Sequence, residues 1–248
     1  MIDIRSHDEF PPLALSEDDR VFVLTGAGIS KESGIPTFRD ADGLWEGHAV
    51  EDVATPGAWA RNPELVWQFY SERRSNGATC EPNRGHEALA AAQSKVAQMY
   101  ICTQNVDRLH EKAGSKGVVH MHGELYRSCC SDPDCSEPSF VDENAYPSLA
   151  EVPRCGCGAP IRPDIVWFGE EPKELLDIDT TLGTSTLFLA VGTSGVVHPA
   201  AGFVRFMKFR RPNVKTIYVG PEAPDNGHFF DEIRLGPSGT ALPRMFGL

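Results

Sequence analysis

Short apolar runs rich in β-branched residues alternate along this 248-residue chain with segments of helical spacing, and this rhythm constrains the fold more than any other feature. The apolar runs are almost continuous, which is typical of parallel strands that are covered on both faces. We therefore expect an α/β fold with a Rossmann-like, doubly wound parallel sheet. The expected strands cover residues 21–25, 99–103, 118–121, 165–167, 186–191 and 216–219, and the expected helices cover residues 86–96, 108–113, 173–181 and 200–209.

Two stretches break this rhythm, and we expect them to form a smaller lobe. Residues 41–84 look like a helical insertion, in which Asn62 as N-cap and Pro63 as first helical residue mark the start of a helix over residues 63–75. Residues 128–160 are rich in Cys, Pro and Ser and lack a core pattern of their own. The remainder would form a discontinuous nucleotide-binding domain of residues 1–40, 85–127 and 161–248.

The charge balance limits the partners of the chain. It has 23 Lys and Arg against 35 Asp and Glu, a net charge of −12, which argues against a nucleic-acid partner because such binding needs basic patches. No apolar run approaches the roughly 20 residues of a membrane span. The N-terminal segment is acidic and has no apolar core of a signal peptide. We expect a cytoplasmic monomer with neither a nucleic-acid nor a membrane partner.

The first expected strand runs directly into a glycine-rich loop, Gly26-Ala27-Gly28-Ile29. A Gly-x-Gly turn after a strand lets the backbone approach a pyrophosphate and points N–H groups at it. The complete dinucleotide fingerprint fails, because Lys31 stands in place of the third glycine. On this evidence alone, a tight turn in any sheet protein remains an equal alternative. Arg39, further along, could neutralise a phosphate or pair with a surface carboxylate.

Polar side chains also follow three of the expected strands. Gln104, Asn105 and Asp107 come after residues 99–103, His122 comes after residues 118–121, and Gly192-Thr193-Ser194 comes after residues 186–191. Ligands of open α/β sheets bind at the carboxyl ends of the strands. His122 could act as a general base, since the pKa of a histidine lies near neutrality, or be an ordinary hydrogen-bonded histidine. Asn105 and Asp107 could contact a carboxamide or cap the following helix.

The cysteines are strongly clustered. Five of the seven lie between residues 129 and 157, in a chain without a secretion signal, which favours a metal site over disulfides. Cys130 with Cys135 and Cys155 with Cys157 would supply four thiolates to a closed, structural Zn²⁺ site. Cys129 could replace Cys130 in this set.

Together, these residues resemble one family, the sirtuins, which are NAD-dependent protein-lysine deacylases. The matching segments occur in the family's order: GAGIS and GIPTFRD within residues 26–40, TQNVD at 103–107, MHG at 121–123, IRPDIVWFGE at 161–170 and GTS at 192–194. The resemblance runs from about residue 20 to the C-terminus. Each motif is weak by itself, but the set is specific.

The resemblance implies a role for each of these segments. NAD would be held by Gly26, Ala27, Gly28, Ile29, Phe38, Arg39, Gln104, Asn105, Asp107, Gly192, Thr193 and Ser194. His122 would be the catalytic base, and Val166, Trp167, Phe168 and Gly169 would lie in a strand that pairs with the substrate backbone. The spacing of the cysteines from His122 and Arg162 favours Cys130 over Cys129 as a ligand of the single structural zinc. Gly220 stands where many sirtuins have an asparagine near the adenosine ribose, which is a departure from the family pattern.

A finer resemblance is to class III sirtuins, which remove succinyl, malonyl or glutaryl groups. Their Tyr-x-x-Arg signature appears here as Tyr70 and Arg73. Residues i and i+3 share a helix face, so the phenol and guanidinium can converge on one carboxylate. Arg74 points about 100° away from Arg73 on the helix and is the weaker candidate for a partner of the acyl group, so its replacement is expected to change little. A surface Tyr/Arg pair on an ordinary helix is the alternative.

By resemblance, the amide oxygen of an acyl-lysine attacks the nicotinamide ribose, nicotinamide leaves, and the acyl group ends on ADP-ribose. The alternatives within enzymes are a deacetylase without an acidic-acyl preference and a mono-ADP-ribosyltransferase. The alternative from another class is an inactive, zinc-containing nucleotide-binding adaptor, against which the intact His122, Asn105 and Asp107 count.

Overall fold

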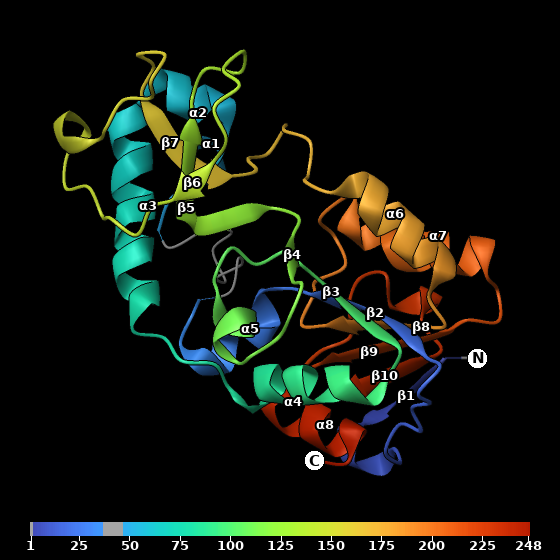
Figure 1. Cartoon of the computed structure of the whole chain (residues 1–248). Helices are drawn as coiled ribbons and strands as arrows, with labels where there is room; N and C mark the ends of the chain where they lie inside the picture. Colours follow the sequence, from blue (N-terminus) through green and yellow to red (C-terminus); the bar gives the residue numbers. More distant parts are fainter. Residues whose placement is uncertain (1, 37–46) are drawn as a thin grey trace. The chain divides into compact units, whose positions relative to one another are not determined.

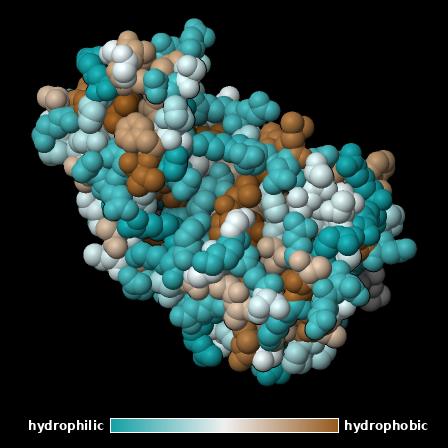
Figure 2. Space-filling view, in the orientation of Figure 1, coloured by the Kyte–Doolittle hydropathy of each residue, from teal (hydrophilic) through white to brown (hydrophobic). Residues whose placement is uncertain are grey.

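The computed structural model describes residues 2–36 and 47–248, which fall into two units. Unit 1 comprises Met1–Thr37, Glu81–Met121 and Glu174–Leu248, and unit 2 comprises Phe38–Cys80 and His122–Lys173. Each unit has its own β-sheet (Figure 1). Hydrophilic residues predominate on the face drawn in Figure 2, as expected for a net charge of −12. Within the described part of the chain, no helix is long and apolar enough to cross a membrane.

Unit 1 is built on a seven-stranded sheet in which all neighbouring strands are parallel, so the predicted α/β fold is confirmed. The central strands are apolar on both sides, because helices cover both faces of the sheet. In spatial order the strands are β1 (Asp3–Ser6), β10 (Glu232–Leu235), β9 (Lys215–Gly220), β8 (Leu187–Val191), β2 (Arg20–Thr25), β3 (Gln98–Thr103) and β4 (Val119–His120).

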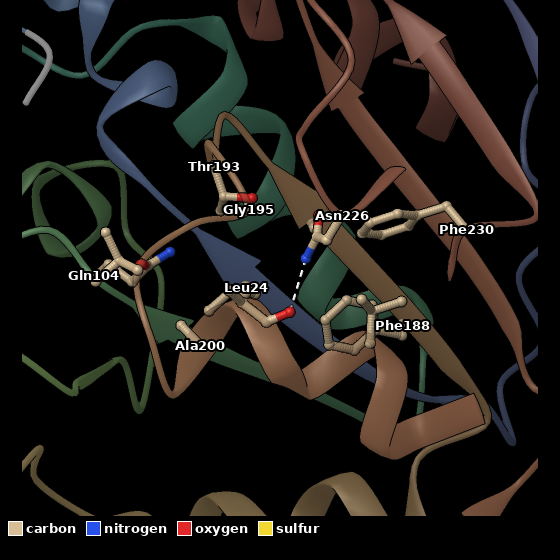
Figure 3. Close-up of a pocket in the computed structure, with 12 residues that line it drawn as sticks. Leu24, Gln104, Phe188, Thr193, Gly195, Ala200, Asn226 and Phe230 are labelled. Carbon is tan, nitrogen blue, oxygen red and sulfur yellow. Dashed lines mark hydrogen bonds between the residues drawn. The ribbon is translucent and has the colours of Figure 1, made fainter. Parts of the chain in front are cut away.

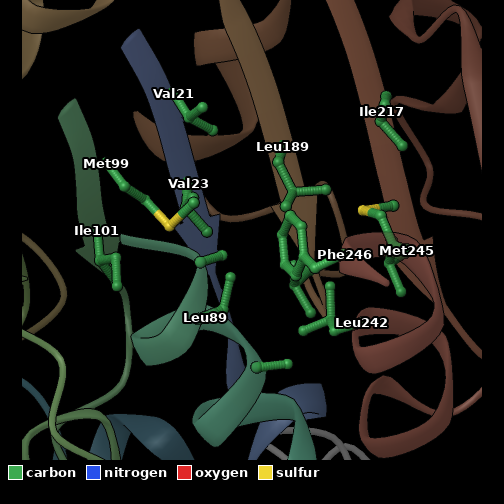
Figure 4. Close-up of a cluster of buried hydrophobic side chains, with 14 of the residues drawn as sticks. Val21, Val23, Leu89, Met99, Ile101, Leu189, Ile217, Leu242, Met245 and Phe246 are labelled. Atoms are coloured by element: carbon green, nitrogen blue, oxygen red, sulfur yellow. The ribbon is translucent and has the colours of Figure 1, made fainter. Parts of the chain in front are cut away.

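The two faces of β2 contribute to two separate cores. Val21 and Val23 pack in the core that includes α4 (Arg84–Ala92) and α8 (Ser238–Phe246), as Figure 4 shows. Phe22 and Leu24 pack in the other core, with side chains of α6 (Leu175–Thr184) and α7 (Phe203–Arg210). Figure 1 shows these two helix pairs on opposite sides of the sheet. Alternation along the strand therefore builds a three-layered unit.

The expected strands match this sheet at β2, β3, β4, β8 and β9, but the sequence pattern missed β1, β10 and helix α8. Both missed strands have four residues: EIRL alternates charged with apolar residues, and DIRS has a single apolar residue. A short, half-polar segment has no periodicity strong enough to distinguish a strand from a loop.

Unit 2 contains a three-stranded antiparallel sheet in the order β6 (Phe140–Val141), β5 (Gly123–Cys130) and β7 (Ile161–Ile165). Its described helices are α1 (Val50–Val53), α2 (Pro56–Arg61) and α3 (Pro63–Ala78). Helix α3 begins as predicted, since the Asn62 side chain accepts a hydrogen bond from the Leu65 N–H at 3.1 Å.

The boundary between the units differs from the one expected from the sequence. Residues 122–127 and 161–173 were expected in the nucleotide-binding domain, but they belong to unit 2. The reason is the pairing of β5 with β7, from Gly123 opposite Ile165 to Cys130 opposite Ile161. The apolar run over residues 165–167, which was expected as a strand of the large sheet, therefore begins at the last residue of β7 in the small sheet.

Arg74 stabilises unit 2 from inside, contrary to the expectation that it matters little. Its side chain is 1% exposed, and all five of its N–H groups donate hydrogen bonds. One acceptor is the Asp142 carboxylate, at 3.1 Å. Burial would raise the pKa of Asp142, but hydrogen bonds from Ser128 and Arg74 bring it below its ordinary value. Removing one partner of such a buried pair typically costs about 3–5 kcal/mol.

Two buried histidines of unit 1 lie against each other. The rings of His86 and His110 have centroids 5.0 Å apart, and Nε2 of His110 lies 3.0 Å from Oγ1 of Thr25. Burial lowers the pKa of His86 to about 4 and that of His110 to about 3. His86 is also the third residue of α4, where its Nδ1 accepts a hydrogen bond from the N–H of the N-cap residue Asn83.

We expect His86→Gln to protect the protein from acid. A lowered pKa gives stability that is present above the unfolded value of 6.5 and is lost as the pH falls toward about 4. This loss amounts to roughly 3 kcal/mol at about 1.4 kcal/mol per pKa unit. Glutamine keeps the capping contact to Asn83 and removes the titrating ring. Denaturant unfolding at neutral and at mildly acidic pH measures the difference.

The exposed His228 provides the control, since His228→Gln should leave the acid sensitivity as it is in the wild type. An equal loss of stability in acid for His86→Gln and the wild type would show that the buried ring does not cause it.

Candidate functional site

The carboxyl ends of three adjacent parallel strands, β2, β3 and β8, carry most of the nucleotide-side residues predicted from the sequence. Backbone hydrogen bonds connect the loops that follow these strands: Gly26 donates to Val191 O at 3.0 Å, and Gln104 donates to Thr25 O at 3.0 Å. Predicted residues far apart in the sequence are thereby brought together at one edge of the sheet, where open α/β sheets bind ligands.

The glycine loop after β2 packs directly on the loop after β8. The Gly28 N–H donates to Gly192 O at 2.9 Å, and a Cβ on Gly28 would lie 2.7 Å from backbone atoms of Gly192. Gly192 has φ +61°, where side chains are disfavoured. Glycine is therefore required at both positions, because only a bare backbone allows this approach.

Asn105 and Asp107 meet at Ser30, a residue that the sequence analysis did not single out. Nδ2 of Asn105 donates to Gly26 O and to Oγ of Ser30, each at 3.2 Å, and Ser30 Oγ donates to Asp107 Oδ2 at 3.0 Å. Asp107 also accepts a hydrogen bond at 3.0 Å from the N–H of Leu109, the first residue of α5 (Leu109–Lys112). Burial raises the pKa of Asp107, and the Leu109 and Ser30 hydrogen bonds partly offset this rise.

A pocket opens in unit 1 beside these loops (Figure 3). The predicted residues Gln104 and Thr193 line it, together with Asn226. Nδ2 of Asn226 donates to Ala201 O at 2.8 Å, whereas its buried Oδ1 has no hydrogen-bond partner among the described residues. An acceptor of this kind suits a ligand with hydroxyl or amide donors, such as a dinucleotide. The other lining residues are Leu24, Phe188, Ala190, Gly195, Val197, Ala200, Ala201, Val204 and Phe230.

Gly220, the departure noted in the sequence, is explained by its neighbour Tyr218. A Cβ on Gly220 would lie 2.3 Å from the Tyr218 hydroxyl oxygen, so the phenol occupies the space that a side chain at position 220 would need. The same hydroxyl donates to Thr193 O at 3.1 Å. Tyr218 thus holds the loop after β8 and fills the space beside Gly220, where the sequence pattern indicated only a missing asparagine.

His122 lies in unit 2, at the turn before β5, and its carbonyl accepts a hydrogen bond from the Val166 N–H at 2.9 Å. Residues 166–169 were expected to form a strand, but they form an irregular turn after β7. The cause is Glu170, whose carboxylate accepts the Trp167 N–H at 2.8 Å and pairs with Arg162 at 2.8 Å. The Phe168 N–H is bound to Ala54 O, and Gly169 has φ +96°, which ends the extended backbone.

Tyr70 and Arg73 lie on the buried side of α3. Tyr70 is fully buried, and its oxygen accepts a hydrogen bond from Nε1 of Trp167 at 3.2 Å. Arg73 is 8% exposed, and its guanidinium carbon lies 5.4 Å from the centre of the Phe69 ring. Burial raises the pKa of Tyr70 strongly, and the charge of Arg73 opposes this rise. The pair is therefore buried, unlike an ordinary surface pair.

The four predicted zinc ligands form one cluster in unit 2. The Sγ atoms of Cys130, Cys135, Cys155 and Cys157 all lie within 4.8 Å of one another. The distance is 3.5 Å from Cys130 to Cys157 and 3.7 Å from Cys135 to Cys155. Four sulfurs at 2.3 Å from a tetrahedral Zn²⁺ would be about 3.8 Å apart, so the donor set fits this metal. Cys129 points to the opposite side of β5, as neighbouring strand residues do, which confirms the choice of Cys130.

Of the predicted site residues, Phe38 and Arg39 lie outside the described residues.

Comparison with known proteins agrees with these features. Residues 26–199 match the Sir2 family. The NAD-dependent protein deacylase SIR2rp3 of Leishmania major is 45% identical over 231 residues, which cover 90% of this chain and 92% of that protein. The NAD-dependent protein deacylase of Caulobacter vibrioides is 43% identical over 228 residues, or 90% and 94% of the two chains. A solved Sir2 homolog–NAD complex has a TM-score of 0.82 at 34% identity and covers 96% of this chain and 95% of its own. The chain therefore belongs to the Sir2 family, the sirtuins.

Proposed function

We propose that this sirtuin is an NAD-dependent protein-lysine deacylase that prefers acidic acyl groups, with succinyl and malonyl as the main substrates and glutaryl as a further one. The deacylase activity is supported by the relatives of 43–45% identity that carry this name. The acyl preference is supported by one observation, the buried Tyr70 and Arg73 on a single face of α3.

The preference follows from the cost of moving a carboxylate out of water. An ionised acyl group in a largely buried pocket is unfavourable unless a cation and hydrogen-bond donors meet it. A guanidinium can donate two parallel N–H groups to a carboxylate. A phenol can accept one hydrogen bond at its oxygen, as Tyr70 does from the indole N–H of Trp167, and can donate another through its O–H. Arg73 would therefore supply the charge and Tyr70 a neutral hydrogen bond.

The loops of unit 1 would hold NAD, with the glycine loop and residues 192–194 at the phosphates and ribose. Gln104, Asn105 and Asp107 would lie on the nicotinamide side. NAD supplies an activated ribose carbon that loses nicotinamide and a hydroxyl that takes over the acyl group. His122 would accept a proton from that hydroxyl, and residues 166–169 would bind the substrate backbone.

A deacetylase without acidic-acyl preference is the second candidate. The hydrogen bond from Trp167 to Tyr70 favours it, because this contact gives Tyr70 a structural function within unit 2. Mono-ADP-ribosyl transfer from the same NAD site is a third candidate. Acyl-lysine peptides that differ only in the acyl group distinguish the first two, and transfer of labelled ADP-ribose to protein tests the third.

His122→Ala should leave a folded protein that binds NAD but deacylates at least about 100-fold more slowly, since this is the usual contribution of a general base. Nicotinamide release with acyl-peptide measures turnover, and calorimetry measures NAD binding. His228→Ala, at an exposed position, is the control. Turnover near that of the wild type would remove His122 from the mechanism.

One zinc ion per chain is expected by elemental analysis, and Cys130→Ser should lower the zinc content far more than Cys129→Ser. The loss of one thiolate opens a closed four-cysteine site, whereas Cys129 lies outside the cluster. Chelation should expose residues 128–160 to protease before the sheet of unit 1 unfolds. The reverse order of the two serine variants would reassign the ligand, and an active, zinc-free protein would rule out the site.

Arg73→Met should lower kcat/KM for succinyl-lysine by about 30- to 5,000-fold, the range expected when a buried charge loses its partner. Acetyl-lysine has no carboxylate, so its turnover should stay the same or rise. Tyr70→Phe should act in the same direction but more weakly, mainly through KM, because the lost hydroxyl is neutral. Kinetics on matched acetyl and succinyl peptides measure both effects.

The neighbouring Glu72 is exposed on the same helix, and Glu72→Gln is the matched control. Arg74 cannot serve as one, because its replacement would disrupt the core of unit 2. Arg73→Lys keeps the charge without the fork and should give an intermediate loss on succinyl-lysine. Equal losses on acetyl and succinyl peptides would favour the deacetylase without acidic-acyl preference.

A further inference from the structure

His120 connects three successive segments of unit 1. It lies on β4, opposite Thr103 at the end of β3, and its side chain is 7% exposed. Its Nδ1 is 2.8 Å from the main-chain carbonyl oxygen of Asn105, in the loop after β3. Its Nε2 is 2.9 Å from Oε1 of Glu111, on α5. The sequence pattern alone indicates no function for His120.

The chemistry of these two partners fixes the protonation state of the ring. A carbonyl oxygen and a carboxylate oxygen both accept hydrogen bonds and cannot donate. A neutral imidazole has one N–H and one lone pair, so it could satisfy only one of the two acceptors. The imidazolium has two N–H groups and satisfies both.

We propose that His120 is a positioning residue which, as an imidazolium paired with Glu111, holds the main-chain carbonyl of Asn105 and thereby sets the Asn105 carboxamide on the nicotinamide side. This inference rests on the proposed NAD-binding function of the loop after β3.

The other contacts of Asn105 explain why its carbonyl matters. The Asn105 N–H donates to Thr103 Oγ1 at 3.0 Å, and its side-chain amide donates to Gly26 O and Ser30 Oγ. The residue is therefore held at its amide nitrogen, its side chain and its carbonyl. Among these contacts, that of His120 is made by an imidazole, a side chain that can gain or lose a proton.

Among the titratable groups around this contact, His120 is the imidazole that can carry a positive charge. His110 on α5 stays neutral, because burial and, to a smaller extent, the charges of His86 and His120 lower its pKa to about 3. Asp107 faces His120 from the loop after β3, and Cys102 on β3 has its pKa raised by burial. Glu111 is 42% exposed and is the carboxylate in contact with the ring.

Replacing Glu111 with glutamine separates the contact from its charge. A glutamine amide can donate to the lone pair of Nε2, so a neutral imidazole can then keep both contacts, with its remaining N–H on the Asn105 carbonyl. The wild type should lose the carbonyl contact as the pH rises and the ring loses its proton, whereas Glu111→Gln should not.

Nitrogen NMR of the histidine rings in the whole protein provides the first test, with His120→Asn to assign the signals. Near pH 7.5, where a free histidine is about nine-tenths neutral, we expect both ring nitrogens of His120 to carry protons in the wild type. In Glu111→Gln we expect one protonated nitrogen. A neutral His120 in the wild type at this pH would overturn the proposal, and this result does not depend on the function of the protein.

Nicotinamide inhibition of acetyl-peptide turnover, measured between pH 6 and pH 9, provides the second test. Affinity for nicotinamide in the wild type should fall about tenfold with rising pH, the usual effect of losing one charge-assisted hydrogen bond. Glu111→Gln should show little pH dependence. Glu81→Gln removes a carboxylate from the nearby pair with Lys112 and should keep the slope of the wild type.

The side-chain variants complete the test. His120→Asn, which keeps a donor toward the carbonyl, should retain most of the nicotinamide affinity, and His120→Ala should lose about tenfold. A protonated His120 combined with identical nicotinamide affinities in all variants would overturn the positioning role. A failure of nicotinamide to inhibit any variant would instead contradict the proposed NAD site.

Discussion

The contact between two bare backbones, Gly28 and Gly192, is the constraint on which the rest of unit 1 depends. A single Cβ on either residue would lie within 2.7 Å of main-chain atoms of the other loop, so the loops after β2 and β8 can meet only as glycines. This approach sets the direction in which the chain leaves β2 and so places the Gly26 carbonyl and the Ser30 hydroxyl. Asn105 and, through Ser30, Asp107 are positioned by these two groups. A loop that looks like a simple tight turn therefore determines the geometry of the neighbouring polar side chains.

The sequence predicts the centre of this fold well and its edges poorly, for a physical reason. Central strands such as β2 and β8 are apolar on both faces, and their carboxyl ends must meet at one edge, so the convergence of the loops after β2, β3 and β8 could be expected. The edge strands β1 and β10 lack that signature. The turn at residues 166–169 was mistaken for a strand because its apolar letters do not reveal that Glu170 accepts the Trp167 N–H. Contacts of this kind depend on tertiary structure, as does the bridging position of Ser30.

Unit 2 shows how adjacent residues of one helix can take different functions. Arg74 uses all five N–H groups on acceptors of β5 and of the segment after β6, so none remains for a ligand. Arg73, one residue earlier, projects about 100° away on the face of Tyr70. The helical spacing distinguished these directions from the sequence alone. The spacing could not show that Arg74 stabilises the core of unit 2. An arginine can be buried only where acceptors surround it, and their positions depend on the tertiary structure.

The histidines of unit 1 show the same dependence on acceptors, with a consequence for binding. His86 and His110 stay neutral because they are buried, whereas His120 faces two acceptors and requires a second proton. Loss of that proton would have two opposite effects on ligands at the neighbouring loop. It would release the Asn105 carbonyl, which weakens any ligand that needs the carboxamide in place. It would also leave the Glu111 carboxylate without its counter-ion, which favours a cationic ligand through charge alone. The nicotinamide ring of NAD is cationic and free nicotinamide is neutral, so only the free base reports the positioning effect without the electrostatic one.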